Sequence, residues 1–476
     1  MTSETPLPVL VVDLDGTLLR SDILFETFWS ALGRNWQTPI QAVGALMQSK
    51  AKLKRDLAQS GPLDVATLPY DPEVISYVKN WRNRGGRTAL VTASDERIAN
   101  GIFDHLGIFD EVYGSDGVRN LKGPAKASFL KDHFEGGFAY MGDAHADIPV
   151  WSQAERAITV NTSASLRSTV DSLDAQVDHL QTRPNTIKPY IKAMRPHQWL
   201  KNILVFLPML AAHQYDWGTF LAALMAFISF SMVASSAYVT NDLLDLAADR
   251  AHPRKCKRPF ASGAIPIAHG TWMAMGMLAL GVIIAASVNL ALLGAMIFYY
   301  VATTAYSLNI KRRIVIDIIV LAGLYTTRII AGGYATEIPL SVWLLAFSVF
   351  FFLSLASVKR QAELIDTAKR GAMEAAGRGY QVDDLPLISQ VAISSGYVSV
   401  LVMALYINSP TVVELYRSPT ALWVVCLILL YWLTRIIMIT HRGHMHDDPV
   451  VFAAKDRTSQ LCFLGILFCA IWGALL

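Results

Sequence analysis

Residues 9–17 read Val-Leu-Val-Val-Asp-Leu-Asp-Gly-Thr, so that two carboxylates, a glycine and a hydroxyl come directly after an aliphatic run. This pattern predicts a buried strand that ends in a polar turn. Short β-branched runs recur at 88–91 and 157–160, separated by charged amphipathic stretches, which indicates an α/β domain with a parallel sheet. Ligands bind at the carboxyl ends of such strands, so Asp13 and Asp15 are candidate site residues.

Two neighbouring carboxylates repel each other, and Mg²⁺ with oxygen ligands would relieve that repulsion. Further polar groups follow later predicted strands. They are Thr92 in Leu-Val-Thr-Ala-Ser, Lys122 before a glycine that opens a helix, and Asp143 with Asp147 in Met-Gly-Asp-Ala-His-Ala-Asp. The alternative for residues 9–17 alone is a plain strand followed by an Asp-Gly turn.

These four segments, in this order across residues 9–147, resemble the motifs of the haloacid dehalogenase superfamily of phosphohydrolases. The resemblance implies a Rossmann-like fold, with Asp13 as the nucleophile and Asp15 as general acid and then base. It also implies that Thr92 and Lys122 hold the phosphoryl oxygens, and that Mg²⁺ is bound by Asp13, Asp15, Asp143 and Asp147. Lys126 is the alternative to Lys122 for this role. We prefer Lys122 because a glycine follows it. Residues 21–68 are expected to form a small helical cap. A degenerate domain that binds without hydrolysis is the alternative.

The composition changes after this domain. Apolar residues make up 53% of the chain and charged residues 17%, which suits neither a soluble protein nor a wholly membrane-embedded one. We assign residues 1–181 to the phosphatase-like domain, 182–189 with two prolines to a linker, and 190–476 to an all-α membrane domain. About nine apolar runs are expected to span the bilayer, at 199–212, 217–239, 267–288, 290–307, 314–334, 339–358, 387–407, 419–439 and 460–476.

The distribution of charged residues predicts the location, the membrane topology and the partners of the protein. Lysine and arginine gather after the second, fourth, sixth and eighth runs, whereas the other loops contain only Arg417. The positive-inside rule then predicts a multi-pass protein of the inner membrane with its N-terminal domain in the cytoplasm, and the polar stretch 1–8 does not resemble a signal peptide. A net charge of +3 gives no reason to expect a nucleic-acid partner. The oligomeric state stays open, a homo-oligomer included.

An acidic segment closes the second apolar run. At 100° per residue, Asn241, Asp242, Asp245 and Asp249 fall at about 0°, 100°, 40° and 80° around a helix, which predicts four oxygen ligands on one face. Such a cluster near a membrane suits one or two Mg²⁺ ions. The basic loop that follows, with Arg254, Lys255 and Arg258, suits a phosphorylated anion. The plain alternative is a solvated acidic helix end beside a positive-inside loop.

Residues 190–476 resemble the UbiA-type superfamily of intramembrane prenyltransferases, through the Asp-rich segment, Tyr306 with Lys311, and the loop after the sixth run. The second Asp-rich motif of typical members is replaced here by Lys359-Arg360-Gln-Ala-Glu363-Leu-Ile-Asp. Together with Arg195-Pro-His-Gln-Trp-Leu-Lys201-Asn202, this loop is similar to the branch that contains decaprenyl-phosphate phosphoribosyltransferase. That resemblance implies phosphoribosyl diphosphate as donor and a polyprenyl phosphate as acceptor.

Extra cations suit a donor that carries a 5-phosphate besides its diphosphate and an acceptor that is itself a phosphate, so Arg195, Lys201, Lys359 and Arg360 are candidate anion ligands. Arg195 and Lys201 would alternatively extend to lipid headgroups. Arg328, inside the fifth run, is a further candidate, with an ion pair to a neighbour such as Asp317 as the alternative. The two halves together predict phosphoribosyl transfer to lipid phosphate followed by removal of the 5-phosphate. The alternatives are an aromatic or quinone-type prenyltransferase with an accessory phosphatase, and a non-enzymatic lipid-binding or transport module.

Overall fold

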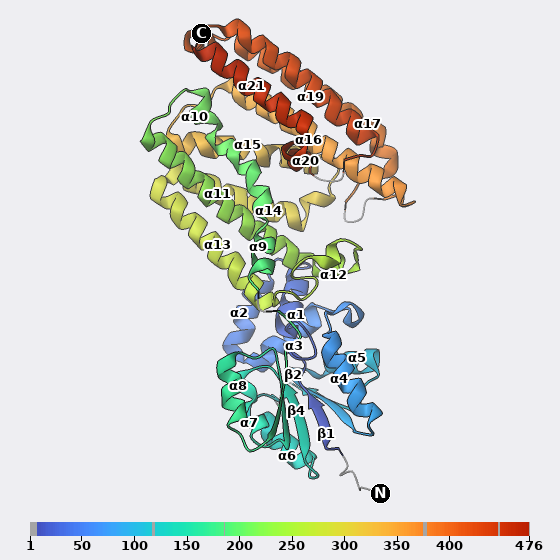
Figure 1. Ribbon diagram of the computed structural model, residues 1–476. Coiled ribbons are helices and arrows are strands. Elements are labelled where there is room, and N and C mark those ends of the chain that lie inside the picture. Colours follow the sequence, from blue (N-terminus) through green and yellow to red (C-terminus); the bar gives the residue numbers. More distant parts are fainter. Residues whose placement is uncertain (1–6, 117–119, 185, 375–377, 446–447, 476) are drawn as a thin grey trace. The chain divides into compact units, whose positions relative to one another are not determined.

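The computed structural model of the chain describes residues 7–475 apart from 117–119, 185, 375–377 and 446–447 (Figure 1). It divides into two compact units. One comprises Met1–Met194 with Tyr238–Ala274, and the other comprises Arg195–Ala237 with Met275–Leu476. The acidic segment after the second apolar run therefore belongs to the same unit as the N-terminal domain.

The N-terminal domain contains a six-stranded sheet in the order β3-β2-β1-β4-β5-β6, and every described pair of neighbours is parallel. The strands predicted at 9–12, 88–91 and 157–160 are confirmed as β1, β2 and β5. The chain leaves β1 in one direction along the sheet and returns at β4 to build the other half. Ligands of such sheets bind where the strand order reverses, which here is between β1 and β4. The strands are β1 (Val9–Val12), β2 (Thr88–Asp95), β3 (Glu111–Ser115), β4 (Phe138–Gly142), β5 (Arg156–Val160) and β6 (Gln176–Leu180).

Helices cover both faces of the sheet because successive strand residues point to opposite sides. Leu10 and Val12 pack in the core under α4 (Pro72–Asn83) and α5 (Glu96–Leu106). Val11 faces the core on the other side, which is completed by α6 (Pro124–His133), α7 (Ile148–Trp151) and α8 (Ala164–Asp171). The α/β prediction is confirmed.

The predicted helical cap is present as α1 (Ile23–Leu32), α2 (Thr38–Gln48), α3 (Lys50–Ser60) and the short 3₁₀ segment η1 (Val65–Thr67). Asp22 caps α1 by accepting the backbone N–H of Leu24 at 2.8 Å. The cap also contacts residues 238–274 of its own unit. Trp29 donates its indole N–H to Thr271 at 3.0 Å, and Arg250 donates to both carboxylate oxygens of Glu26 at 2.6 and 3.1 Å.

The Glu26–Arg250 ion pair is buried, with side-chain exposures of 2% and 7%. Replacing Arg250 with Met leaves a buried carboxylate that keeps the hydrogen bond from the Ser21 hydroxyl but loses its counter-ion, so we expect a loss of about 3–5 kcal/mol of stability. Adding Glu26→Gln should restore most of that loss. Thermal unfolding of the detergent-solubilised full chain measures both changes, and equal melting temperatures for Arg250→Met and the parent would contradict the prediction.

Within the described residues, eight helices are long and apolar enough to cross a membrane. They are α11 (Trp217–Leu244), α13 (Ile267–Val288), α14 (Leu290–Leu308), α15 (Ile316–Thr336), α16 (Val342–Lys369), α17 (Leu385–Ile407), α19 (Trp423–His441) and α21 (Arg457–Leu475). These match eight of the nine predicted spans.

The first predicted span, 199–212, is not one continuous helix. It falls on the 3₁₀ segment η3 (Pro196–Phe206) and the five-residue helix α10 (Leu207–Ala211). Pro208 lies in the first turn of α10, where the absence of its N–H is tolerated, whereas the same proline inside a continuous helix would break the hydrogen-bond ladder. The apolar composition of this stretch therefore did not predict its backbone conformation.

Candidate active sites

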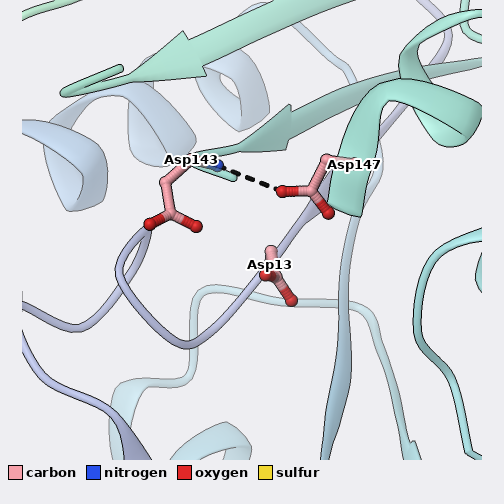
Figure 2. A group of neighbouring side chains, drawn as sticks. All are labelled: Asp13, Asp143 and Asp147. Atoms are coloured by element: carbon pink, nitrogen blue, oxygen red, sulfur yellow. Dashed lines mark hydrogen bonds between the residues drawn. The ribbon is translucent and has the colours of Figure 1, made fainter. Parts of the chain in front are cut away.

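The acidic residues that follow β1 and β4 converge in the N-terminal domain (Figure 2). Asp13, Asp143 and Asp147 each offer a carboxylate oxygen, and these oxygens lie within 4.8 Å of one another. The backbone N–H of Asp143 donates to Asp147 at 3.2 Å, and the Tyr140 hydroxyl donates to the other oxygen of Asp147 at 2.9 Å. The sheet thus brings together three of the four carboxylates predicted at this edge.

The charge of this cluster is poorly compensated by the protein alone. Burial raises the pKa of Asp143 well above its usual range, and the neighbouring charges of Asp13 and Asp147 raise it further. Gly16 has φ 77°, and a Cβ at this position would collide with the Asp143 carboxylate, so the loop approaches the cluster closely only with glycine. Three convergent oxygen donors fit a hard divalent cation such as Mg²⁺.

Lys126, rather than Lys122, is the lysine that contacts Asp13. Its Nζ donates to Asp13 Oδ1 at 2.7 Å and to the Tyr140 hydroxyl at 3.0 Å, and the residue is 2% exposed. Lys122 is exposed. The reason is that α6 begins at Pro124, so that Lys126 lies in its first turn and faces the sheet while Lys122 precedes the helix. Our preference for Lys122 is therefore not supported by the geometry.

The two lysines form a matched pair for a test. We expect Lys126→Met to lower hydrolysis of a small phosphate ester by about 10²-fold or more, because a cation beside the nucleophile stabilises the transferring phosphoryl group. Lys122→Met should have a smaller effect, because Lys122 is exposed and interacts with Asp22 and Lys54 rather than with Asp13. Steady-state phosphatase assays measure both. If Lys122→Met lowered hydrolysis more than Lys126→Met, Lys122 would be the lysine that stabilises the transferring phosphoryl group.

Asp15 lies apart from the acidic cluster. Its carboxylate accepts the backbone N–H of Ile23 at 2.8 Å and the Ser94 hydroxyl at 2.7 Å. Burial, and then the charge of Asp22, raises its pKa to about 7. A carboxyl group of this pKa can donate and accept a proton near neutral pH, which suits an acid and base better than the metal-ligand role that we also predicted. Thr92 is fully buried within β2, and its Oγ1 accepts the Ser94 N–H at 3.0 Å.

Two residues near this site were not found from the sequence. Tyr140 bridges Lys126 and Asp147, but it lies inside an apolar strand where its hydroxyl gave no signal. Lys54, on α3 of the cap, donates to the carbonyl of Ala93 at 2.7 Å. Burial lowers the pKa of Lys54, and the charge of Asp15 opposes that change. The cap thus contributes a cation to the edge of the sheet where Asp15 lies.

The acidic segment of residues 241–249 differs from the predicted single helical face. The helix α11 ends at Leu244, Asp245 lies at the junction with φ −97° and ψ 13°, and α12 (Leu246–Ala251) follows. Asp242 and Asp249, each 2% exposed, accept from Arg258 Nη1 at 3.1 and 2.6 Å, while the amide of Asn241 donates to Asp245 at 3.2 Å.

The donor set of this segment suits Mg²⁺, but its carboxylates are not drawn together as those around Asp13 are. Burial raises the pKa of Asp249, and the guanidinium of Arg258 opposes that change. Among the residues that the structure describes, Asp242, Asp245 and Asp249 do not form a group with mutually close oxygens. Arg258 therefore takes the position between two carboxylates that we predicted for a metal. Arg254 and Lys255 are exposed beside it.

In the second unit, two of the predicted cations meet at a carboxylate that the sequence analysis missed. Lys201 Nζ lies 2.7 Å and Lys359 Nζ 3.2 Å from Asp448 Oδ2, and Lys201 also lies over the ring of Tyr325. Burial alone would raise the pKa of Asp448, but the two ammonium groups hold it well below its usual range. Asp448 lies 247 and 89 positions from Lys201 and Lys359, so spacing gave no signal for it.

Two further predicted cations are engaged by internal partners. Arg360 is fully buried, pairs with Asp317 at 2.6 Å and contacts Glu363. Arg328 donates to the side-chain oxygen of Asn202 at 3.0 Å and to the hydroxyl of Tyr299 at 3.2 Å. The suggested Arg328–Asp317 pair is wrong, since Asp317 pairs with Arg360.

The remaining predicted residues lie at helix ends. The Tyr306 hydroxyl accepts from Arg378 at 2.7 Å, and Arg378 also lies 3.6 Å from Glu363. Lys311 is half-buried in the 3₁₀ segment η5 (Ile310–Arg312). Arg195 has φ 54° immediately before η3. Arg378 was not predicted, because it is one of several basic residues in its loop.

Two family models match separate stretches of the chain. The model of the UbiA prenyltransferase family matches residues 202–452, more than half of the chain. The chain belongs to the UbiA prenyltransferase family. The model of haloacid dehalogenase-like hydrolases matches residues 10–152 of this UbiA-family protein. Both resemblances predicted from the sequence are confirmed, and the protein is an enzyme with a transferase domain and a hydrolase-like domain.

Relatives of this UbiA-family protein extend over one or both parts. The uncharacterized protein y4nM of Sinorhizobium fredii is 36% identical over 96% of this chain and 89% of its own length. The decaprenyl-phosphate phosphoribosyltransferase of Mycolicibacterium smegmatis is 32% identical over 59% of this chain and 90% of its own. A solved UbiA homolog from Archaeoglobus fulgidus, bound to GPP and Mg²⁺, is 14% identical over 60% of this chain and 99% of that chain, with a TM-score of 0.46.

Proposed function

We propose that the membrane domain transfers 5-phosphoribosyl from phosphoribosyl diphosphate to a polyprenyl phosphate with release of diphosphate, and that the N-terminal domain then hydrolyses the 5-phosphate to give polyprenyl-phosphoryl ribose. The observation that carries the proposal is the presence, in one chain, of a phosphatase-type acidic cluster and a membrane domain similar to a decaprenyl-phosphate phosphoribosyltransferase. The first reaction leaves a phosphate monoester on the sugar, and the second domain would remove this group.

In the transfer step, a lipid phosphate oxygen forms a bond to C1 of the ribose while the bond from C1 to the diphosphate breaks. The acceptor is already an anion, so no protein base is required. Arg258, Arg254 and Lys255 would neutralise charge on the departing diphosphate. Lys201 and Lys359 would bind a second phosphate, which would displace Asp448 as their partner.

In the hydrolysis step, Asp13 would attack phosphorus to form an aspartyl-phosphate while Asp15 protonates the departing sugar oxygen. Asp15 would then accept a proton from the water that attacks the aspartyl-phosphate, releasing inorganic phosphate and regenerating both carboxyl groups. Lys126 would neutralise the phosphoryl oxygens. The raised pKa of Asp15 supports this order, since the acid must hold a proton at the start.

Mg²⁺ would be held by Asp13, Asp143 and Asp147 in the hydrolase, and by Asn241, Asp242, Asp245 and Asp249 in the transferase. The cation supplies charge neutralisation of phosphate and diphosphate oxygens. At the transferase site, Arg258 would have to leave its position between Asp242 and Asp249 to make room.

The charge bias of the loops supports an inner-membrane protein with both sites on the cytoplasmic side. Incubating purified protein with labelled phosphoribosyl diphosphate and a polyprenyl phosphate, followed by mass spectrometry of the lipids, tests the proposal. We expect polyprenyl-phosphoryl ribose. Product formed only from a prenyl diphosphate and an aromatic acid would overturn it in favour of the prenyltransferase alternative.

A further inference from the structure

The cap helix α2 exposes an apolar face. Ile40, Val43 and Met47 are 71%, 59% and 84% exposed, and Trp36, just before the helix, is 69% exposed. At 100° per residue, the three helical residues lie within an arc of about 60°, opposite the buried Ala45. A helix at a water-facing surface normally has a polar outer face, so the outer face of α2 needs an apolar environment.

The charged residues of the segment that contains this face are all basic, and the nearest acidic residue along the chain, Asp56, lies 4.0 Å from Lys52. Between Gly33 and Arg55 every charged residue is basic, and the first acidic residue is Asp56. Arg34, Lys50 and Lys52 are exposed. An apolar helical face bordered by cations matches the acyl chains and anionic headgroups of a lipid surface. It does not match a second copy of the same face, because two copies would bring like charges together.

The cap also contacts residues of its own unit that adjoin two candidate membrane spans. Within the first unit, α1 contacts α12, the short helix that follows α11, and the start of α13, and both α11 and α13 are candidate membrane spans. Glu26 of α1 pairs with Arg250, and Trp29 bonds Thr271 of α13. Figure 1 shows α2 beside α1, from which it is separated by residues 33–37. The apolar face therefore belongs to a cap whose helix α1 is bonded to the start of one candidate span and to the short helix that follows another.

We infer that α2 lies in the headgroup region of the bilayer that the chain's own helices cross, with Ile40, Val43 and Met47 directed toward the acyl chains. This contact would keep the cap, and with it the hydrolase site of the same unit, at the lipid surface. The inference does not depend on which phosphate ester the hydrolase takes.

The test uses the full chain with Cys256, Cys426, Cys462 and Cys469 replaced by Ala. A single cysteine at Val43 is labelled with the fluorophore NBD, and the protein is reconstituted into vesicles of phosphatidylcholine and phosphatidylglycerol. Some of the lipids carry a nitroxide on the acyl chain. The matched control is the same label at Gln41, an exposed residue of α2 that lies about 100° from Ile40 around the helix.

We expect quenching at least about twofold stronger at position 43 than at position 41, because only the former would reach the acyl chains. Equal, weak quenching at both positions would overturn the inference. The inference would also be overturned if the fluorescence of the label at position 43 changed with the density of protein in the vesicles but not with the lipid quencher. That result would assign the face to a second copy of the chain. Because both positions are exposed, neither cysteine disturbs the packing of the cap.

Discussion

Replacing Asp13 with Asn should stop the hydrolysis while leaving phosphoribosyl transfer intact, so that a 5-phosphorylated lipid accumulates. The amide keeps the size of the side chain but cannot attack phosphorus, and loss of a nucleophile lowers turnover by at least about 10³-fold. It also removes the charge of one of the three carboxylates of the acidic cluster, which is the ion-pair partner of Lys126. Mass spectrometry of lipids from purified protein, and release of inorganic phosphate, measure the two steps separately.

The matched control for this change is Asp132→Asn, an exposed carboxylate on α6 of the same domain. It should leave both steps unchanged. If Asp13→Asn abolished transfer as well, with normal protein levels, the two-step proposal would fail. If it left hydrolysis intact, the domain would be one that binds phosphate esters without cleaving them by Asp13.

The N-terminal fold was predictable from the sequence because its signals are local. Val9–Val12 is apolar throughout and is followed at once by Asp13, so strand, burial and site position could all be inferred from a few residues. Asp143 and Asp147 follow β4, which pairs with β1, and parallel pairing brings the ends of both strands to one edge. The membrane helices were predictable for a similar reason, since their apolar length is a property of each segment alone.

What the sequence did not reveal depends on where a helix starts or on contacts between distant residues. Lys122 and Lys126 differ by one helical turn, and only the start of α6 at Pro124 decides which faces Asp13. The break in the helix at Asp245 divides the four oxygen ligands that were predicted on one helical face into two pairs. Asp448 lies 247 positions from Lys201, the cation it contacts.

Replacing Asp245 with Asn should stop transfer while sparing hydrolysis. Asp245 lies between α11 and α12, where its carboxylate accepts from Asn241, and the amide has nearly the same shape without the charge. Losing one anionic ligand of a diphosphate-binding metal site should lower transfer by about 10²-fold or more. Labelled phosphoribosyl diphosphate measures the transfer, and a small phosphate ester measures the hydrolase in the same sample.

Asp366→Asn serves as the matched control, because Asp366 is an exposed carboxylate that pairs with Arg370 on the same helix. It should retain full transfer. A chain that only bound or moved lipid would keep its function with Asn at position 245, so unchanged lipid handling in that variant would exclude a transferase. Loss of transfer with intact hydrolysis would instead place the two reactions at two separate carboxylate sites of one polypeptide.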